Sequence, residues 1–139
     1  RLSPEAPVPV VWANRENYLL GGAANVAFNL SSLGVKSAIS GVAGRDFYSK
    51  QIEGLMKKEK IDNSLVLNTQ GRPTTLKTRV IARHQQVVRI DWESSEELSL
   101  KINRKIVNSI RGNIDKFDTV VIEDYGKGVI NPHILEEVL

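Results

Sequence analysis

The stretch Leu20–Gly34 reads LGGAANVAFNLSSLG, and it decides the fold. Two glycines open it, small residues follow, and apolar residues recur at Val26, Leu30 and Leu33. This spacing predicts a glycine turn that leads into a helix with one apolar face. Gly34 directly follows the last apolar residue, which is typical of a helix C-terminal stop. We therefore expect one helix here, with a bare first turn.

The start of this helix is a candidate ligand site. Gly21 and Gly22 permit positive φ angles and let a ligand approach the main chain closely. Free N–H groups at a helix N-terminus bind oxygen-rich or anionic ligands. The side chain of Asn25 both donates and accepts, which suits a hydroxyl. Most glycine-opened helices bind nothing, so the pattern alone leaves a purely structural role open.

Composition bounds the class of protein. The chain has 139 residues, of which 41% are hydrophobic and 25% charged, as in ordinary globular domains. The absence of cysteine excludes disulfides and cysteine-ligated zinc. A net charge of +3 is too mild to indicate nucleic-acid binding. No apolar run approaches the roughly 20 residues that a membrane-spanning helix needs.

Helical and strand-like segments alternate along the chain. The proline-edged segment 8–12 predicts an edge strand that pairs with 18–20 in a hairpin. Asp46 and Asn131 are expected to cap helices. The remaining expected strands are 36–42, 66–67, 74–82, 86–91 and 119–122, and the remaining helices are about 47–60, 100–110 and from 132 onward. This alternation predicts an α/β fold with a mainly parallel sheet flanked by helices.

The hairpin within 74–91 concentrates cations. Lys77, Arg79, Arg83 and Arg89 fall in this short span, and strand alternation places the first three on one face. Such cations suit a phosphate, which arginine can bind in a fork. Charged residues also protect solvated edge strands, so the pattern alone supports both interpretations equally.

A second polar segment, Glu123–Gly128, follows the apolar strand expected at 119–122. Ligands of parallel sheets usually bind beyond the carboxyl ends of the strands. Carboxylates there can accept from hydroxyls, and Lys127 can neutralise phosphate, although a simple polar turn fits equally well. His84 and His133 have no second histidine or cysteine nearby in sequence, which argues against a metal site.

Taken together, these segments resemble the PfkB/ribokinase-like carbohydrate kinases. The sequence Gly21-Gly22-Ala23-Ala24-Asn25-Val26-Ala27, followed by Leu33-Gly34, is similar to the N-terminal signature of that family. Further similarity, to the bacterial heptose 7-phosphate kinases, lies in four segments in the same order: 2–11, 73–79, 85–91 and 124–128. The resemblance covers nearly the whole chain.

The resemblance implies a ribokinase-like α/β fold with a small β-lid over the sugar. Residues 1–139 would form the N-terminal, sugar-binding part of one kinase domain, with lid segments at about 5–20 and 73–92. The lid of this family often packs against a second subunit, so a homodimer is expected. The family's first strand would precede Arg1, and its ATP-binding part would follow Leu139.

The resemblance also implies an activity. The parent enzyme would use ATP and Mg²⁺ to phosphorylate D-glycero-D-manno-heptose 7-phosphate at its anomeric hydroxyl, in the bacterial cytoplasm. The product, the 1,7-bisphosphate, feeds ADP-heptose and lipopolysaccharide core synthesis, and a fused adenylyltransferase domain is common. Another PfkB-type sugar kinase, or a non-catalytic module that binds sugar or only dimerises, remains an alternative.

Site residues carry over position by position. The expected substrate-binding residues are Gly21, Gly22, Asn25, Lys77, Arg79, Gln86, Arg89 and Asp91, of which Lys77 and Arg79 would hold the sugar phosphate. Asp124 and Lys127 match a motif near the phosphoryl-transfer region. The catalytic base of the family is expected after Leu139, in a Gly-Ala-Gly-Asp motif. We therefore expect no catalytic residue and no metal ligand within this chain, and no kinase activity from the chain alone.

Overall fold

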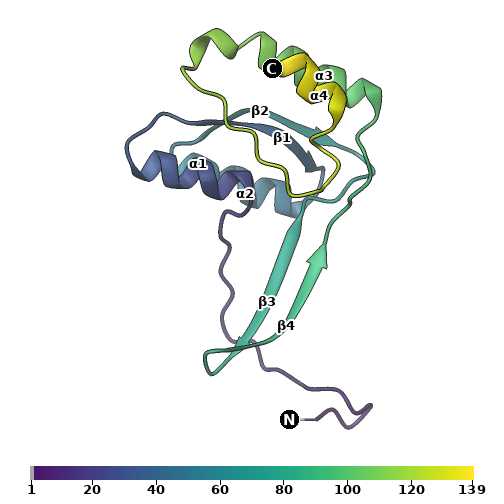
Figure 1. Ribbon diagram of the computed structural model, residues 1–139. Coiled ribbons are helices and arrows are strands. Elements are labelled where there is room, and N and C mark those ends of the chain that lie inside the picture. Colours follow the sequence, from purple (N-terminus) through teal and green to yellow (C-terminus); the bar gives the residue numbers. More distant parts are fainter. Residues whose placement is uncertain (1) are drawn as a thin grey trace.

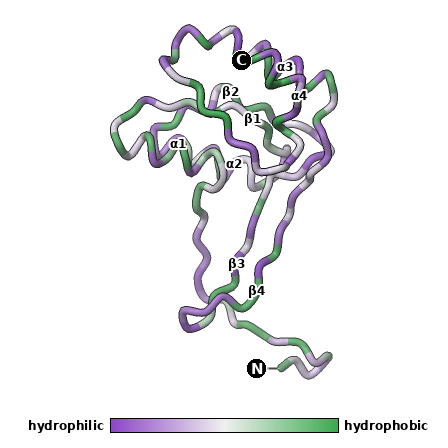
Figure 2. Tube along the Cα trace, viewed as in Figure 1, coloured by the Kyte–Doolittle hydropathy of each residue, from purple (hydrophilic) through white to green (hydrophobic). Residues whose placement is uncertain are grey.

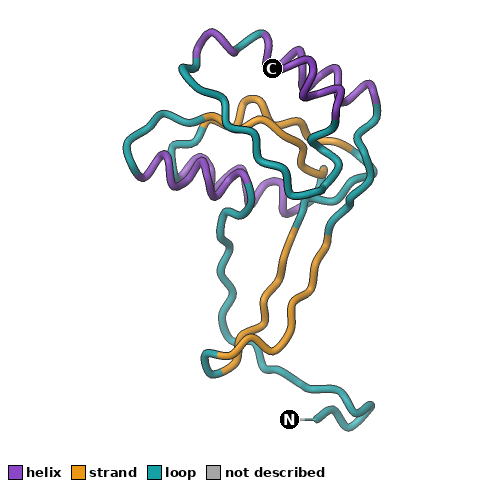
Figure 3. Tube along the Cα trace, in the orientation of Figure 1, coloured by secondary structure: helices purple, strands orange, loops and turns teal. Residues whose placement is uncertain are grey.

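The computed structural model describes residues 2–139. Figures 1 and 3 show a body of helices and strands from which a long two-stranded ribbon extends. The elements in chain order are α1 (Ala23–Ser32), β1 (Ala38–Gly44), α2 (Phe47–Lys58), β2 (Asp62–Thr69), β3 (Leu76–Ala82), β4 (Gln85–Trp92), α3 (Leu100–Arg111), a 3-10 turn η1 (Ile114–Lys116) and α4 (Pro132–Val138).

The body is built on the parallel pair β1 and β2, with α2 as the crossover. Helices α1 and α2 cover one face of this pair, and α3 and α4 cover the other (Figure 1). Met56 and Ile61 form the core on the first side, packed against Ile39 and Val66. On the second side Val42 and Leu67 pack against a core formed by Leu98, Ile106, Val107 and Ile134. The expected α/β class is confirmed, because both faces of the strands are buried under helices.

Helix α1 has the expected bounds and stop. Gly34 adopts a φ of 84°, which a side chain would strain. Its N–H donates to Ser31 O at 2.9 Å, and the Val35 N–H donates to Leu30 O at 3.0 Å. These two bonds make a Schellman motif, which satisfies carbonyls that the end of the helix would leave open.

Helix α2 begins at a capping aspartate, as the sequence predicts. Asp46 Oδ1 accepts the Ser49 N–H at 2.9 Å, and Asp46 Oδ2 accepts the Thr74 N–H at 2.8 Å. One carboxylate therefore caps the helix and also holds the start of the ribbon. Phe47, the first residue of the helix, is 60% exposed.

The ribbon is the antiparallel pair β3 and β4, which confirms the expected hairpin. The strands are joined at Arg83 and His84, whose φ angles are 48° and 72°. Two consecutive positive φ angles give the mirror-image turn that matches the twist of a hairpin. The register shifts between Val80 and Ile81, so the strand opposite carries one extra residue there.

The expected hairpin of strands 8–12 and 18–20 is absent from the described residues, and this prediction was wrong. Neither segment is a strand, and Leu2 and Pro9 form an isolated bridge. Prolines at positions 4, 7 and 9 lack the N–H groups that a ladder requires. Trp12, in the first of these segments, is 83% exposed.

Segment 119–122 is extended but pairs with no described strand. It crosses the body without an arrow in Figure 1, and Figure 2 colours it as hydrophobic. Its Val121 is 63% exposed. An apolar run becomes a strand only when a neighbour supplies hydrogen bonds, and β1 pairs with β2 alone.

Replacing Asp46 by alanine should loosen two segments at once. The loss of a helix cap costs about 1 kcal/mol, which corresponds to a several-fold rise in local opening. Amide hydrogen exchange should therefore quicken at both Ser49 and Thr74. Asp62→Ala is the control, because Asp62 caps only the nearby Ser64 N–H, at 2.8 Å. Faster exchange at Ser49 with unchanged exchange at Thr74 would contradict the dual role of Asp46.

The same contact predicts a dependence on pH. Partial burial acts to raise the pKa of Asp46, but hydrogen bonds from Thr74 and Ser49 outweigh it and lower the pKa below its usual 3.8. A lowered pKa means that the carboxylate contributes its full stability above about pH 4. Protection at Ser49 and Thr74 should fall as the pH drops through the lowered pKa, and this dependence should vanish in Asp46→Ala.

Candidate functional site

Most of the expected substrate-binding residues share one face of the ribbon. The register pairs Lys77 with Asp91 and Arg79 with Arg89. Residues directly opposite each other in an antiparallel pair project to the same side. Gln86, paired with Ile81, continues this face toward the turn. We call the set Lys77, Arg79, Gln86, Arg89 and Asp91, extended by Glu93 two residues beyond Asp91, the polar face of the ribbon.

Ion pairs connect the base of the polar face to the body. Lys77 Nζ donates to Asp91 Oδ2 at 2.9 Å and to Glu93 Oε2 at 2.8 Å. Lys127 Nζ donates to the other Glu93 oxygen at 2.7 Å. Arg89 Nε lies 3.0 Å from Asp91 Oδ1. Glu93, which sequence reasoning missed, is thus the residue that joins Lys77 of the ribbon to Lys127 of the body.

The ion pairs of this network shift the pKa values of the groups that form them. Hydrogen bonds to Glu93 and then to Asp91 raise the pKa of Lys77. Hydrogen bonds from Lys127 and then Lys77 lower the pKa of Glu93, and the bond from Lys77 lowers that of Asp91. The side chains of Lys77, Glu93 and Asp91 are therefore ionised at neutral pH.

Cations outnumber carboxylates at the polar face. Lys77, Arg79, Arg89 and Lys127 stand against Asp91 and Glu93, which leaves two positive charges. Arg79 is exposed and has no ion pair among the described residues. It lies directly across from Arg89, and like charges in this position repel. An anion bound between the two arginines would relieve the repulsion.

The glycine turn forms the second part of the candidate site. Gly22 is the N-cap of α1, with a φ of 54°, and no side chain caps the helix. The Asn25 N–H donates to Gly22 O at 2.9 Å, so within the described chain the N–H groups of Ala23 and Ala24 are the ones left open at this helix start. Asn25 lies in this first turn with its side chain exposed. A Cβ added at Gly22 would meet the ring of Tyr125 at 3.6 Å, so this ring lies against the turn.

The loop 124–128 links the glycine turn to the ribbon. Its Tyr125 ring lies against Gly22, and its Lys127 binds Glu93. Asp124 Oδ1 accepts the Gly126 N–H at 2.8 Å, so this carboxylate shapes the turn. The Tyr125 hydroxyl donates to Glu123 Oε1 at 2.9 Å, and this bond raises the pKa of Tyr125. Of the two expected phosphoryl-transfer residues, Lys127 joins the network and Asp124 holds the loop.

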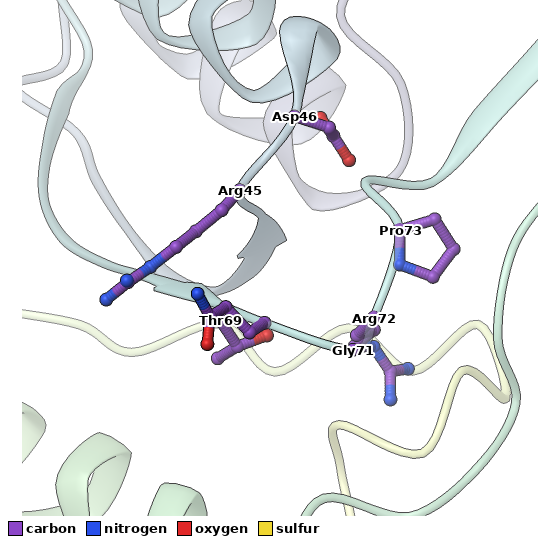
Figure 4. Close-up of a pocket in the computed structure, with 7 residues that line it drawn as sticks. Arg45, Asp46, Thr69, Gly71, Arg72 and Pro73 are labelled. Carbon is purple, nitrogen blue, oxygen red and sulfur yellow. The ribbon is translucent and has the colours of Figure 1, made fainter.

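Arg72, which sequence reasoning did not single out, fixes this loop. Its guanidinium donates to Glu96 O at 2.8 Å, to Ser94 O at 2.9 Å, and to Lys127 O. Burial lowers the pKa of Arg72, since the partners are backbone carbonyls rather than carboxylates. Figure 4 shows the side chain projecting from the segment between β2 and β3. Arg72 thus ties the exit of the ribbon to the loop that carries Lys127.

A close backbone approach supports the same junction. Gly128 has a φ of 66°, and a Cβ there would lie 2.1 Å from Glu96 O. The Leu98 N–H donates to Gly128 O at 3.2 Å. Only glycine fits this position, because the backbone of Gly128 lies directly against the backbone of Glu96.

The structure thus gathers the expected residues into two groups with one connection. Lys77, Arg79, Gln86, Arg89 and Asp91 share the polar face, whereas Gly21, Gly22 and Asn25 lie at the start of α1. No hydrogen bond or ion pair joins the two groups directly within residues 2–139, and the loop 124–128 connects them. The described residues hold no cluster of three or more metal-ligating side chains. None of the helices in the described part of the chain is long and apolar enough to cross a membrane.

Comparison with known proteins gives a consistent result. The family model "pfkB family carbohydrate kinase" matches residues 3–138. The chain is 42% identical over 139 residues to a protein named "Bifunctional protein HldE" from Helicobacter pylori (strain Shi470), covering 100% of this chain and 30% of that protein. Proteins of the same name from Wolinella succinogenes and Trichlorobacter lovleyi are 38% and 44% identical, over 100% and 99% of this chain. The chain spans less than a third of the length of these relatives, at 30%, 29% and 28%.

Arg72→Lys should loosen the junction although it keeps the positive charge. Lysine cannot reproduce the planar fork that reaches three carbonyls. Hydrogen bonds to a charged donor contribute about 2 kcal/mol, which corresponds to a roughly 30-fold rise in local opening. Hydrogen exchange at the Leu98 N–H, which bonds across the junction, should quicken accordingly.

Arg104→Lys provides the matched control for this substitution. Arg104 is exposed on α3 and forms no ion pair in the described part of the chain. Equal exchange at Leu98 in both variants would show that Arg72 does not hold the junction.

Proposed function

The chain belongs to the pfkB family of carbohydrate kinases, and on this premise we propose that it is the sugar-binding part of a heptose 7-phosphate kinase. The parent enzyme would transfer a phosphoryl group from ATP to the anomeric hydroxyl of D-glycero-D-manno-heptose 7-phosphate, in the bacterial cytoplasm. The 1,7-bisphosphate formed would enter ADP-heptose and lipopolysaccharide core synthesis. The resemblance of five ordered segments and the relatives named HldE support this substrate.

The observation that carries the proposal is the opposed pair Arg79 and Arg89. Two arginines directly across a ribbon repel each other, and among the described residues Arg89 has a carboxylate partner, Asp91, whereas Arg79 has none. The polar face together with Lys127 has a surplus of two positive charges, and a phosphate monoester carries about −1.5 to −2 at neutral pH. Arginine can bind it through two parallel hydrogen bonds. The 7-phosphate of the sugar would therefore bind at Arg79, with Lys77 and Arg89 beside it.

The sugar ring would lie toward the glycine turn. The open N–H groups at the start of α1 can donate to hydroxyl oxygens, and the exposed Asn25 amide can both donate and accept. Gln86 and Asp91 add hydrogen-bonding groups on the polar face. Lys127, placed by Arg72 and Glu93, lies in the loop between the two groups and would balance negative charge on the substrate.

ATP and Mg²⁺ are implied by the family rather than by these residues. The described residues offer no cluster of metal ligands, and the Asp124 carboxylate is engaged by the Gly126 N–H. The residues present therefore do not fit a metal site, and we derive no step through the ion. The proposal assigns substrate binding to this chain and proton abstraction to the rest of the enzyme.

Another PfkB-type sugar kinase is the nearest alternative. A kinase for an unphosphorylated sugar such as ribose or fructose would have no use for two opposed arginines, so the polar face favours a phosphorylated substrate. A non-catalytic sugar-binding or dimerisation module would share the fold. It would differ in the full-length protein by binding sugar without turnover.

Arg79→Ala in the full-length enzyme should weaken binding of heptose 7-phosphate by roughly 10- to 100-fold, because a charge-assisted hydrogen bond is worth about 1.5–3 kcal/mol. Binding of the unphosphorylated heptose should change little. Calorimetric titration with both sugars measures the difference. Arg83→Ala, at the tip of the ribbon, is the matched control. An equal loss for both sugars in Arg79→Ala would exclude the phosphate role.

The other face of the ribbon supports a homodimer. The register places Leu76, Val80, Val88, Ile90 and Trp92 on the side opposite to the polar face. Within this apolar face Ile90 is 45% exposed and Trp92 61% exposed. A two-stranded ribbon is marginal by itself and needs a covering surface. The same face of a second subunit is the covering surface that we propose.

Ile90→Lys should shift the full-length protein from dimer to monomer. A buried lysine at the interface would be an unpaired charge, which costs several kcal/mol. Sedimentation velocity over a concentration series measures the shift. Ile81→Lys is the control, since Ile81 is 63% exposed on the polar side of the ribbon. A dimer unaffected by Ile90→Lys would place the interface elsewhere.

A further inference from the structure

A second cationic site lies away from the polar face of the ribbon, where β2 ends beside the first turns of α3. Here a hollow of about 200 Å³ is lined by Arg45, Asn68, Thr69, Gln70, Lys101, Ile102 and Lys105. A neighbouring hollow of about 410 Å³ shares Arg45, Thr69 and Gln70 with it. Figure 4 shows Arg45 extending past the end of β2 and away from Asp46. The hollows have room for far more than one water, which occupies roughly 30 Å³ in the liquid.

The charge of this second site is uncompensated. Arg45, Lys101 and Lys105 line the smaller hollow, and no acidic residue does. None of the three cations forms an ion pair within residues 2–139. This distinguishes the hollow from the polar face of the ribbon, where Asp91 and Glu93 neutralise part of the charge.

The two lysines are arranged unfavourably for the helix that carries them. Lys101 and Lys105 are four residues apart on α3, and like charges at this spacing repel by a few tenths of a kcal/mol. Both lie in the first half of the helix, where the dipole favours acids, and its first turn contains none. An anion bound between them would offset both effects.

A hydroxyl in the same hollow lacks a partner. Thr69 Oγ1 is buried and has no hydrogen bond within the described chain. A buried polar atom without a partner is destabilising, and such atoms often mark the place of an ion or water. Asn68 and Gln70, on either side of Thr69, also line the hollow.

We propose that this hollow is a binding site for a phosphoryl anion. Arg45, Lys101 and Lys105 supply the charge, and Thr69, Asn68 and Gln70 supply hydrogen bonds. The site shares no residue with the polar face of the ribbon, so it does not depend on the sugar-kinase proposal. The phosphoryl group belongs either to free inorganic phosphate or to a small phosphate ester.

The test uses the full-length protein, with its nucleotide site filled by a non-hydrolysable ATP analogue and its sugar site by sugar phosphate. Inorganic phosphate is then titrated by calorimetry at constant ionic strength. Lys101→Gln/Lys105→Gln should weaken phosphate binding at least about tenfold. Lys57→Gln/Lys58→Gln removes the same charge from the last turn of α2 and should leave binding unchanged. A second titration with glucose 6-phosphate distinguishes the source, since the tighter of the two probes identifies a free ion or an ester.

Three results would overturn the proposal. If phosphate binds neither the wild type nor the Lys57→Gln/Lys58→Gln control, the proposed site does not exist. Equal losses in both double variants would indicate a general charge effect. Unaltered binding in Lys101→Gln/Lys105→Gln would place the phosphate elsewhere. Thr69→Val provides a further check that leaves charge intact: it should weaken phosphate binding several-fold if the hydroxyl donates to the anion.

Discussion

The start of the ribbon is held on the body by a buried polar residue, Thr74. It is 7% exposed, and its hydroxyl and its N–H both form hydrogen bonds to residues distant in the sequence. Its hydroxyl accepts the Gly44 N–H at 2.9 Å, while its own N–H donates to Asp46 Oδ2 at 2.8 Å. A Cβ on Gly44 would lie 2.7 Å from Thr74 N, so the strand end and the ribbon touch directly. Because unsatisfied buried groups cost more than satisfied ones gain, this contact specifies one position for the start of β3.

The ion pairs at the base of the ribbon have a different role. Lys77, Glu93 and Lys127 retain about a quarter to a third of their side-chain exposure, at 33%, 26% and 26%. Pairs this exposed contribute little net stability. The backbone contacts of Arg72 and Gly128 fix the position of the loop relative to the ribbon. The ion pairs determine how much of the positive charge at this junction is neutralised. A site built in this way can exchange its internal partners for a substrate phosphate at small cost.

The sequence correctly predicted the elements that depend only on interactions between residues close together in the chain. The stop at Gly34, the caps at Asp46 and Asn131 and the hairpin at 76–92 depend on short-range chemistry, and all four are present. Period-two alternation likewise placed Lys77 and Arg79 on one face. Segment 119–122 has the composition of a buried strand, but its state depends on a neighbouring strand that its own residues do not reveal.

The residues that sequence reasoning missed act over long separations. Arg72 lies 55 positions before Lys127, whose carbonyl it binds, and Glu93 lies 34 positions before the same residue. No motif of fixed spacing reports such contacts. A signal was nevertheless present for Glu93, because period two carries the alternation of Arg89 and Asp91 onward to it. For Arg72 the only hint was a cation between glycine and proline, where a turn directs a long side chain inward. A residue that joins two elements in this way can be identified only once the fold shows which unpaired backbone carbonyls lie within reach of its cation.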